Sequence, residues 1–218
     1  MHRPPRLEFP NALYHVTSRG ARREAIFRDD ADRACLLAIL AAALQACEAH
    51  LFSYCLMGNH YHLVVRTPKA NVSALMHRIN STYSAAFNRR HGLRGAVFEG
   101  RFKAFLVDRD GYLLQVCRYV DLNPVRAGLV GAPRQWGWSS YRAHVGIEAA
   151  PRWLATTEML GMLSGSSAED PARGVEARRA YAAWVEAGRA VQLWKESLRQ
   201  GRFLGDETFV ARITRELS

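Results

Sequence analysis

A β-hairpin is predicted by the stretch LFSYCLMGNHYHLVVR at residues 51–66. Two apolar runs flank the turn residues Gly58 and Asn59, and a two-residue turn of this kind joins antiparallel strands. Side chains alternate between the two faces of a strand, so His60 and His62 leave the second strand on the same face. The hairpin therefore presents two imidazoles side by side on one face of a sheet.

The segments on either side of the hairpin predict a four-stranded α+β fold. Strands are expected at residues 13–19, 51–57, 60–66 and 101–107. Helices are expected from Asp29 or Asp30 to about Ala49, from about Val72 to Arg90, and from Asp108 or Asp110 to the residue before Pro124. The order strand-helix-strand-strand-helix-strand is the split β-α-β pattern of ferredoxin-like folds. We therefore expect a ferredoxin-like antiparallel sheet followed by one further helix.

Beyond Pro124 the pattern weakens. The aromatic cluster WGWSSY at residues 136–141 is expected to cover part of the core. The stretch SGSSAEDPARG at residues 164–174 is the best linker candidate, and two helices are expected after it, at about 175–199 and 206–217. This predicts one domain over residues 1–148 and a helical C-terminal extension over residues 149–218, whose role the sequence does not indicate.

Composition indicates a globular protein without a membrane span. The chain has 218 residues, of which 49% are hydrophobic, and no apolar run approaches the 18 residues of a spanning helix. The start lacks the apolar stretch of a signal peptide, so we expect a cytoplasmic protein without a membrane partner. Association with the nucleoid of a bacterium would follow only from DNA binding. The four scattered cysteines are expected to be reduced thiols.

Basic residues are concentrated in the first part of the chain. Thirty Lys and Arg against 20 Asp and Glu give a net charge of +10, and residues 1–130 carry 18 basic and 10 acidic side chains, or +8 of this total. Only three of the 30 are lysines, and guanidinium groups suit phosphates and base edges. An arginine-rich proteome would give the same composition without any nucleic-acid partner, so charge permits DNA binding without establishing it.

A metal site with a tyrosine nucleophile is one interpretation of the histidine pair. Tyr119 and Asn123 are four residues apart on the helix before Pro124, so they share one face, and this helix can pack across the sheet over His60 and His62. Two imidazoles and one amide oxygen suit Mg²⁺ or Mn²⁺ better than structural zinc. A cation beside a phenol suits phosphoryl transfer, in which the tyrosine oxygen attacks phosphorus. The alternative is a core tyrosine, a helix-ending asparagine and two ordinary histidines.

These motifs resemble those of the REP-associated tyrosine transposases, which are single-tyrosine members of the His-hydrophobe-His (HUH) nucleases. The resemblance covers about residues 7–145. It rests on CLMGNHYHLVV at 55–65, RYVDLNPVRAG at 118–128, LYHVTSRG at 13–20, FEGRFK at 98–103 and WGWSSY at 136–141.

The resemblance implies roles for individual residues. His60 and His62 match the metal pair of the family, Tyr119 its nucleophile and Asn123 its third metal ligand. Such enzymes cut single-stranded DNA, keep the 5′ side of the break as a phosphotyrosine and release a 3′ hydroxyl that can rejoin. Relatives recognise hairpins of repetitive extragenic palindromes with a short guide sequence at the hairpin foot. We therefore expect a DNA transposase and endonuclease, active as a monomer or homodimer in DNA transposition and recombination.

The chain departs from the family pattern at two positions. Gly58 stands where many relatives have proline, which should only loosen the hairpin turn. Ala21 stands where many have asparagine, which puts one polar DNA contact in doubt.

Several residues have two readings. Tyr112, seven residues before Tyr119, is the rival nucleophile. His15, Thr17 and Arg19 share one face of the first strand, where they line the catalytic floor or, for His15, simply pack. Phe102 is expected to stack an unpaired base or to pack in the core. The candidate phosphate contacts, each also a plausible solvated charge, are Arg19, Arg22, Arg23, Arg89, Arg90, Arg94, Arg101 and Lys103.

Three other functions remain open on the sequence alone. A relaxase or replication initiator is disfavoured because the chain lacks a helicase-sized extension and a paired second tyrosine. A hairpin-binding regulator without catalysis is disfavoured by the intact set of His60, His62, Tyr119 and Asn123. A zinc hydrolase lacks a third histidine or cysteine ligand and an obvious general base.

Overall fold

The protein is seen in a computed structural model that describes residues 7–164, 171–189 and 203–206, together with residues 208, 209, 211 and 215. Five strands form one sheet in the order β2-β3-β1-β4-β5. The strands are β1 (Ala12–Arg19), β2 (His50–Leu56), β3 (His60–Thr67), β4 (Lys103–Val107) and β5 (Phe203–Leu204). The first four pair antiparallel, and β5 lies parallel to β4. The order β2-β3-β1-β4 is that of the split β-α-β fold, so the expected α+β class is confirmed.

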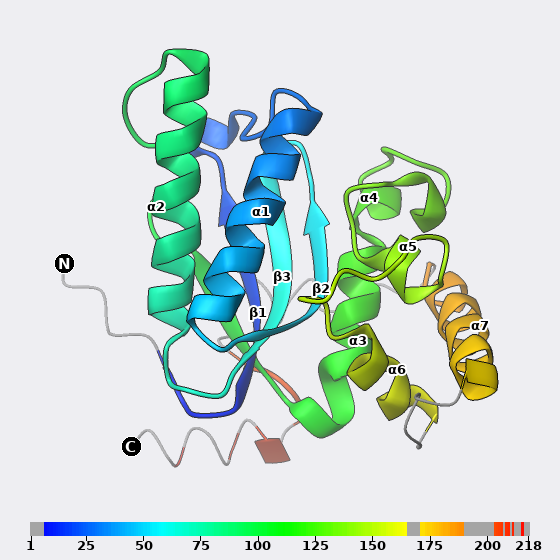
Figure 1. The fold of residues 1–218 in the computed structure, drawn as a ribbon. Coiled ribbons are helices and arrows are strands. Elements are labelled where there is room, and N and C mark those ends of the chain that lie inside the picture. Colours follow the sequence, from blue (N-terminus) through cyan, green and yellow to red (C-terminus); the bar gives the residue numbers. More distant parts are fainter. Residues whose placement is uncertain are drawn as a thin grey trace.

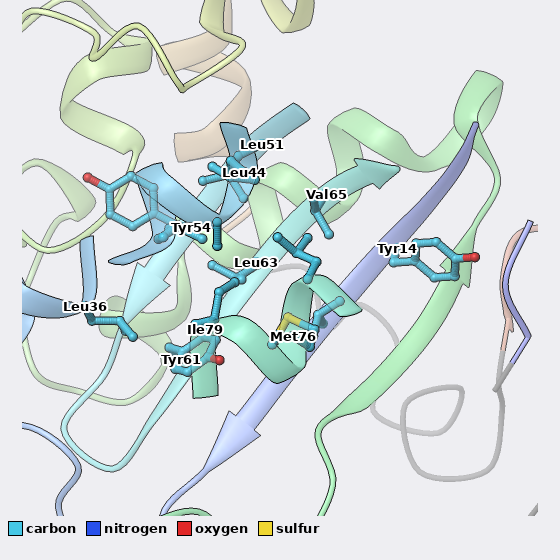
Figure 2. Packing of buried hydrophobic residues seen from close by; sticks show 14 of the residues in the cluster. Tyr14, Leu36, Leu44, Leu51, Tyr54, Tyr61, Leu63, Val65, Met76 and Ile79 are labelled. Carbon is cyan, nitrogen blue, oxygen red and sulfur yellow. The ribbon is translucent and has the colours of Figure 1, made fainter. Parts of the chain in front are cut away.

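Helices α1 (Asp30–Ala46) and α2 (Val72–His91) lie side by side on one face of the sheet (Figure 1). Asp29 caps α1, because its side chain accepts a hydrogen bond from the backbone N–H of Asp32. Gly92 ends α2 in the left-handed region, with φ of 64°. Figure 2 shows the core between these helices and the sheet, where Tyr61, Leu63 and Val65 of β3 meet Met76 and Ile79 of α2.

Helix α3 (Arg109–Asp121) covers the opposite face of the sheet. Val116, Cys117 and Val120 of this helix pack with Val64 of β3 and Phe52 of β2. The expectation that this helix packs across the sheet is therefore confirmed, and the face that it covers is the one opposite α1 and α2. Pro124 comes after α3 and lies in the first turn of the short helix α4 (Asn123–Arg126), where its missing N–H costs nothing.

Two later helices complete this second layer. Met159 and Leu160 of α6 (Thr156–Ser164) and Tyr181 and Val185 of α7 (Pro171–Ala187) join the same apolar cluster as α3. Three shorter helical segments are η1 (Ala21–Arg23), η2 (Pro133–Gln135) and α5 (Tyr141–His144).

The C-terminal part departs from the sequence prediction in its boundaries. Helix α6 was not predicted, and α7 begins at Pro171, inside the predicted linker 164–174, because proline is favourable in the first turn of a helix. Helix α7 ends at Ala187, whereas the predicted helix ran to residue 199. Residues 190–202, and most of the helix predicted at 206–217, lie outside the described residues. The domain boundary at 148/149 stays a prediction.

The segment from Trp136 to Ser140 runs along the outer edge of β2. The backbone N–H of Leu56 donates to the carbonyl of Trp138 at 2.8 Å, and the indole of Trp136 donates to the carbonyl of Leu56 at 3.2 Å. Trp136 packs on the apolar cluster of α3, and Trp138 on that of α1 and α2. The expectation that this aromatic segment covers part of the core is confirmed.

Cys47, Cys55 and Cys117 are buried, Cys35 is half-buried, and all four are free thiols. None of the helices in the described ranges is long and apolar enough to cross a membrane.

Candidate active site

The two histidines of β3 face α3. Tyr61, between them, belongs to the apolar cluster on the α1 and α2 face, so His60 and His62 leave the other face. Strand β1 lies beside them in antiparallel register, with Thr17 opposite His62 and Arg19 opposite His60. The rings of His60 and His62 are 5.0 Å apart between centroids. The histidine pair predicted from the strand alternation is therefore present on the sheet.

Tyr119 of α3 contacts His62, one member of this pair. Its ring centroid is 6.1 Å from that of His62 and 5.7 Å from that of His15 on β1, in edge-to-face contacts. The guanidinium carbon of Arg126 lies 5.1 Å from the centre of the Tyr119 ring. Residues from one helix and two strands thus meet at a single point, as the sequence predicted for Tyr119 and His62.

Asn123 is the first residue of α4, one turn after Tyr119. Its Nδ2 donates to the carbonyl oxygen of Tyr119 at 3.0 Å and to that of Val120 at 3.3 Å. Both contacts engage the amide nitrogen, which leaves the carboxamide oxygen as the group suited to a cation.

The hydrogen bonds of the histidines leave one nitrogen of each ring available. His60 Nδ1 lies 2.8 Å from Asn59 Oδ1, and His62 Nδ1 lies 3.0 Å from His15 Nε2. Within the described part of the chain, Nε2 of His62 is buried with no hydrogen-bond partner. A buried polar atom without a partner is costly, and a metal ion would satisfy it. The residues present therefore fit a divalent cation.

Burial keeps the histidines neutral. It lowers the pKa of His60 to about 4, with the nearby charge of Arg19 as a further cause. It lowers the pKa of His62 well below its usual range, with help from His15, His60 and Arg19. Neutral imidazole is the form that binds metal ions, so these shifts keep both rings competent as ligands at physiological pH.

The phenol of Tyr119 is held protonated. Burial raises its pKa, while the positive charges of Arg126 and Arg19 act in the opposite direction. The two guanidiniums therefore stabilise the phenolate that a nucleophilic attack would require.

The alternative nucleophile, Tyr112, lies near the start of α3. Tyr112 is two helical turns before Tyr119, or roughly 10 Å along the helix axis, and it packs at the edge of the α3 cluster. The choice of Tyr119 as nucleophile stays a prediction.

The candidate DNA contacts are spread over several elements. Arg19 lies at the end of β1 beside the histidine pair, and its charge acts on both histidines and on Tyr119. Arg22 and Arg23 are exposed in η1 with positive φ, and Arg89 is exposed in the last turn of α2. Arg90 forms ion pairs with Asp29 at 2.6 Å and with Asp32 at 2.5 Å, so it also has a structural role at the start of α1.

Lys103 is the first residue of β4, and Arg101 lies two residues before it. Both are exposed, and Arg101 lines a pocket of about 680 Å³ with Phe102, Asn80 and other residues of α2. Phe102 also packs partly against the core, so both of its predicted roles are compatible with its position.

Two features of the site escaped the sequence analysis. The predicted helix ended before Pro124, so helix spacing could not be used to relate Arg126 to Tyr119. In the structure the Arg126 guanidinium lies over the Tyr119 ring. Asp121 is fully buried and accepts hydrogen bonds from Tyr181 at 2.8 Å and Ser140 at 2.9 Å, which ties the helix of Tyr119 to later segments. An acidic residue in a run of apolar neighbours was the only signal for this contact.

No cluster of three His, Cys, Asp or Glu side chains suited to a metal occurs among the residues described. A cation bound by His60 and His62 would therefore take its third protein ligand from another residue type, for which Asn123 is placed one turn from Tyr119.

Comparisons with known proteins place this geometry in a family. A family model described as "Transposase IS200 like" matches residues 8–123, a range that includes His60, His62, Tyr119 and Asn123. No curated protein matches the chain. Among solved structures, the chain is similar to one described as "Structure of the REP associates tyrosine transposase bound to a REP hairpin". That match has a TM-score of 0.57 and 17% sequence identity, and it covers 71% of this chain and 92% of the other. Because the family model spans more than half of the 218 residues, the chain belongs to the family of IS200-like transposases.

Proposed function

We propose that this transposase is a metal-dependent single-strand DNA endonuclease and strand transferase that cleaves at hairpin-forming palindromic DNA. The observation that carries the proposal is the contact of Tyr119 with His62, whose buried Nε2 has no hydrogen-bond partner in the described residues and whose ring lies beside that of His60. A nucleophile beside a cation site is the arrangement that phosphoryl transfer needs.

His60, His62 and Asn123 would hold the cation, and Mg²⁺ or Mn²⁺ suits this mixed nitrogen and oxygen set with open positions. When bound, the cation polarises the scissile phosphate and favours negative charge on its oxygens.

Tyr119 is the nucleophile in this proposal. Its phenolic oxygen loses a proton and attacks phosphorus, the new O–P bond forms, and the bond from phosphorus to the 3′ oxygen breaks. The 3′ oxygen leaves with the electron pair and takes up a proton, and the 5′ side of the break stays joined to Tyr119 as a phosphotyrosine. The linkage conserves the energy of the phosphodiester, so a 3′ hydroxyl can reverse the step without ATP.

The DNA partner rests on charge and on likeness to a structure described as holding a REP hairpin. The first 130 residues carry +8 of the net charge of +10, and hairpin DNA offers a dense phosphate backbone. We propose that the arginines near the site, beginning with Arg19, hold this backbone.

A covalent-adduct assay tests the proposal. The full chain is incubated with Mg²⁺ and labelled hairpin DNA that carries a single-stranded flank, and adducts are resolved on denaturing gels. We expect an adduct with the wild type and with Tyr112→Phe and none with Tyr119→Phe, which should still bind the hairpin because its ring still packs.

The competing outcomes identify the other functions. An adduct with Tyr119→Phe but not with Tyr112→Phe would make Tyr112 the nucleophile. Cleavage in excess chelator would refute metal dependence. Tight hairpin binding without any adduct under Mg²⁺ or Mn²⁺ would indicate a regulator that lacks catalysis.

A further inference from the structure

A third histidine, His15, contacts Nδ1 of His62, the ring nitrogen other than the unpartnered Nε2. His15 lies on β1 with 1% of its surface exposed, and its Nε2 is 3.0 Å from His62 Nδ1. The two rings are nearly parallel, at 13°, with centroids 5.2 Å apart. His15 therefore occupies the position next to a candidate metal ligand.

The hydrogen bond between these two rings contains one proton, and its position decides whether His62 can bind a cation. A neutral imidazole, the form that binds metal ions, carries a single N–H. If His15 donates from Nε2, His62 carries its own proton on Nε2 and that nitrogen has no lone pair to offer. If His62 donates from Nδ1, its Nε2 is free, and the proton of His15 lies on Nδ1.

The two arrangements leave different atoms unsatisfied. Nδ1 of His15 and Nε2 of His62 are both buried without a partner within the described ranges. Without a cation, one of these atoms is a buried N–H with no acceptor and the other a buried lone pair with no donor, whichever tautomer is present. A cation can bind Nε2 of His62 only when that nitrogen is unprotonated, which requires His62 to donate the hydrogen bond from Nδ1 to His15. Cation binding therefore selects this tautomer.

We propose that His15 is a positioning residue, whose Nε2 accepts a hydrogen bond from Nδ1–H of His62 and so holds that ring in the tautomer and orientation that can ligate a divalent cation. This inference rests on the proposed metal site. His15 also contacts the ring of Tyr119 at 5.7 Å, so the same side chain sets the spacing between the ligand strand and the nucleophile helix.

Packing around His15 provides a matched control. Phe105 of β4 stacks on His15 with centroids 5.9 Å apart and is itself buried. Phe105→Leu disturbs the packing of His15 but leaves its hydrogen bond to His62. A purely structural role for His15 predicts equal effects of both substitutions, whereas a positioning role does not.

The experiment measures Mn²⁺ affinity of the full chain by electron paramagnetic resonance, without DNA and without turnover. His15→Phe keeps a ring and removes the acceptor, so we expect affinity to fall about 10- to 100-fold, as it does when an outer partner of a ligating histidine is lost. His15→Gln places an amide oxygen near the former Nε2, so it should restore most of the affinity. Phe105→Leu should stay within about threefold of the wild type, and His60→Ala should abolish specific binding.

The outcomes separate the two hypotheses. If the wild type binds Mn²⁺, His60→Ala does not, and His15→Phe binds as the wild type does, the positioning role is refuted and the metal site stands. Equal losses in His15→Phe, His15→Gln and Phe105→Leu would also refute it, because they indicate packing alone. If wild type and His60→Ala bind Mn²⁺ equally, the metal site itself is wrong and the inference fails with it.

Nuclear magnetic resonance of the imidazole nitrogens with Mg²⁺ gives an independent readout. The expected spectrum shows the His62 proton on Nδ1 and the His15 proton also on Nδ1. A proton on Nε2 of His62 in the Mg²⁺-loaded protein would overturn the proposal.

Discussion

Burial and nearby charge shift the pKa of the Tyr119 phenol in opposite directions. Burial disfavours the phenolate, and the guanidiniums of Arg126 and Arg19 favour it. The closer contact described is that of Arg126, whose charge lies over the ring at 5.1 Å. The charges that lower the pKa of this phenol thus come from two elements, β1 and α4.

Removing the charge of Arg126 should slow cleavage. Arg126→Gln takes away a cation that lowers the pKa of Tyr119, so that pKa should rise and less phenolate should be present at any pH below it. We expect a roughly tenfold loss of single-turnover rate at saturating DNA, the size of a contact worth about 1.4 kcal/mol, and a shift of the pH–rate profile to higher pH. Arg152→Gln, which removes an exposed charge, is the control. An unshifted profile would assign Arg126 to DNA binding alone.

The buried histidine of β1 should make stability depend on pH. Burial lowers the pKa of His15 from 6.5 to about 4, so between these values the unfolded chain binds a proton that the folded chain does not. Stability should fall as pH drops from 6.5 to 4 and level off below, by about 3 kcal/mol for this residue, since each pKa unit is worth about 1.36 kcal/mol. Urea unfolding of metal-free protein at pH 7 and pH 4 should show that His15→Phe loses about 3 kcal/mol less than the wild type. Equal losses would mean that His15 is not buried as described.

Helix α3 connects the sheet to the later helices α6 and α7. Its inner side meets β3 and carries Tyr119, and its outer side contacts α7. The Arg118 guanidinium lies 4.0 Å from the centre of the Trp184 ring, and the Tyr181 hydroxyl donates to Asp121 at 2.8 Å. The position of the tyrosine helix is therefore determined partly by residues 60 or more positions later in the chain.

Breaking one contact of this network should destabilise the fold. Tyr181→Phe leaves the buried carboxylate of Asp121 with one donor fewer, and we expect a loss of about 1–3 kcal/mol in unfolding free energy. Tyr54→Phe is a suitable control, because the Tyr54 ring packs against Trp153 at 5.7 Å, whereas the side chains hydrogen-bonded to Asp121 are Ser53, Ser140, His144 and Tyr181. Denaturant unfolding of the two variants checks this, and equal stability would show that water replaces the tyrosine without cost.

Over the whole molecule, the positive charge is concentrated in the first part of the chain, whereas the apolar packing extends through later helices. The positive charge lies mostly in residues 1–130, yet the second apolar cluster extends through α6 and α7. Cutting the chain after about Gly146 would remove Met159, Leu160, Tyr181 and Val185 from that cluster and expose its remaining members. Substitutions in the full chain are therefore the sound way to locate the DNA-binding surface.

The salt dependence of hairpin affinity should identify that surface. Arg101→Ala and Lys103→Ala should each reduce the slope of log affinity against log salt by about 0.7–0.9, which is the value of one lost phosphate contact. Arg179→Ala, an exposed arginine of α7, should leave the slope unchanged. Fluorescence anisotropy at several salt concentrations measures this. A reduced slope only for Arg179→Ala would move the DNA-binding surface to the C-terminal helices.

The sequence predicted the sheet and the histidine pair because both depend on short periods. Alternation along residues 60–66 determines which side chains share a face, and helix spacing joins Tyr119 to Asn123. It could not predict the contacts of Asp121 with Tyr181 or of His15 with His62, because these depend on which strands and helices become neighbours. Helix α6 was not predicted. The start of α7 was placed too late because Ser, Gly and Pro at 164–171 indicate a linker, whereas α7 begins at Pro171 and its apolar side chains pack in the cluster of α3.

The Trp136–Ser140 segment along β2 has a consequence for self-association. An open strand edge is a template on which a second copy can extend the sheet, and repeated extension leads to aggregates. Here the backbone of the β2 edge is already paired with Trp138 and Ser139, and with Ala155 farther along. A homodimer of this chain would therefore not form through a continuous sheet across β2. The covering segment thus protects this edge from the strand-by-strand addition that leads to aggregates.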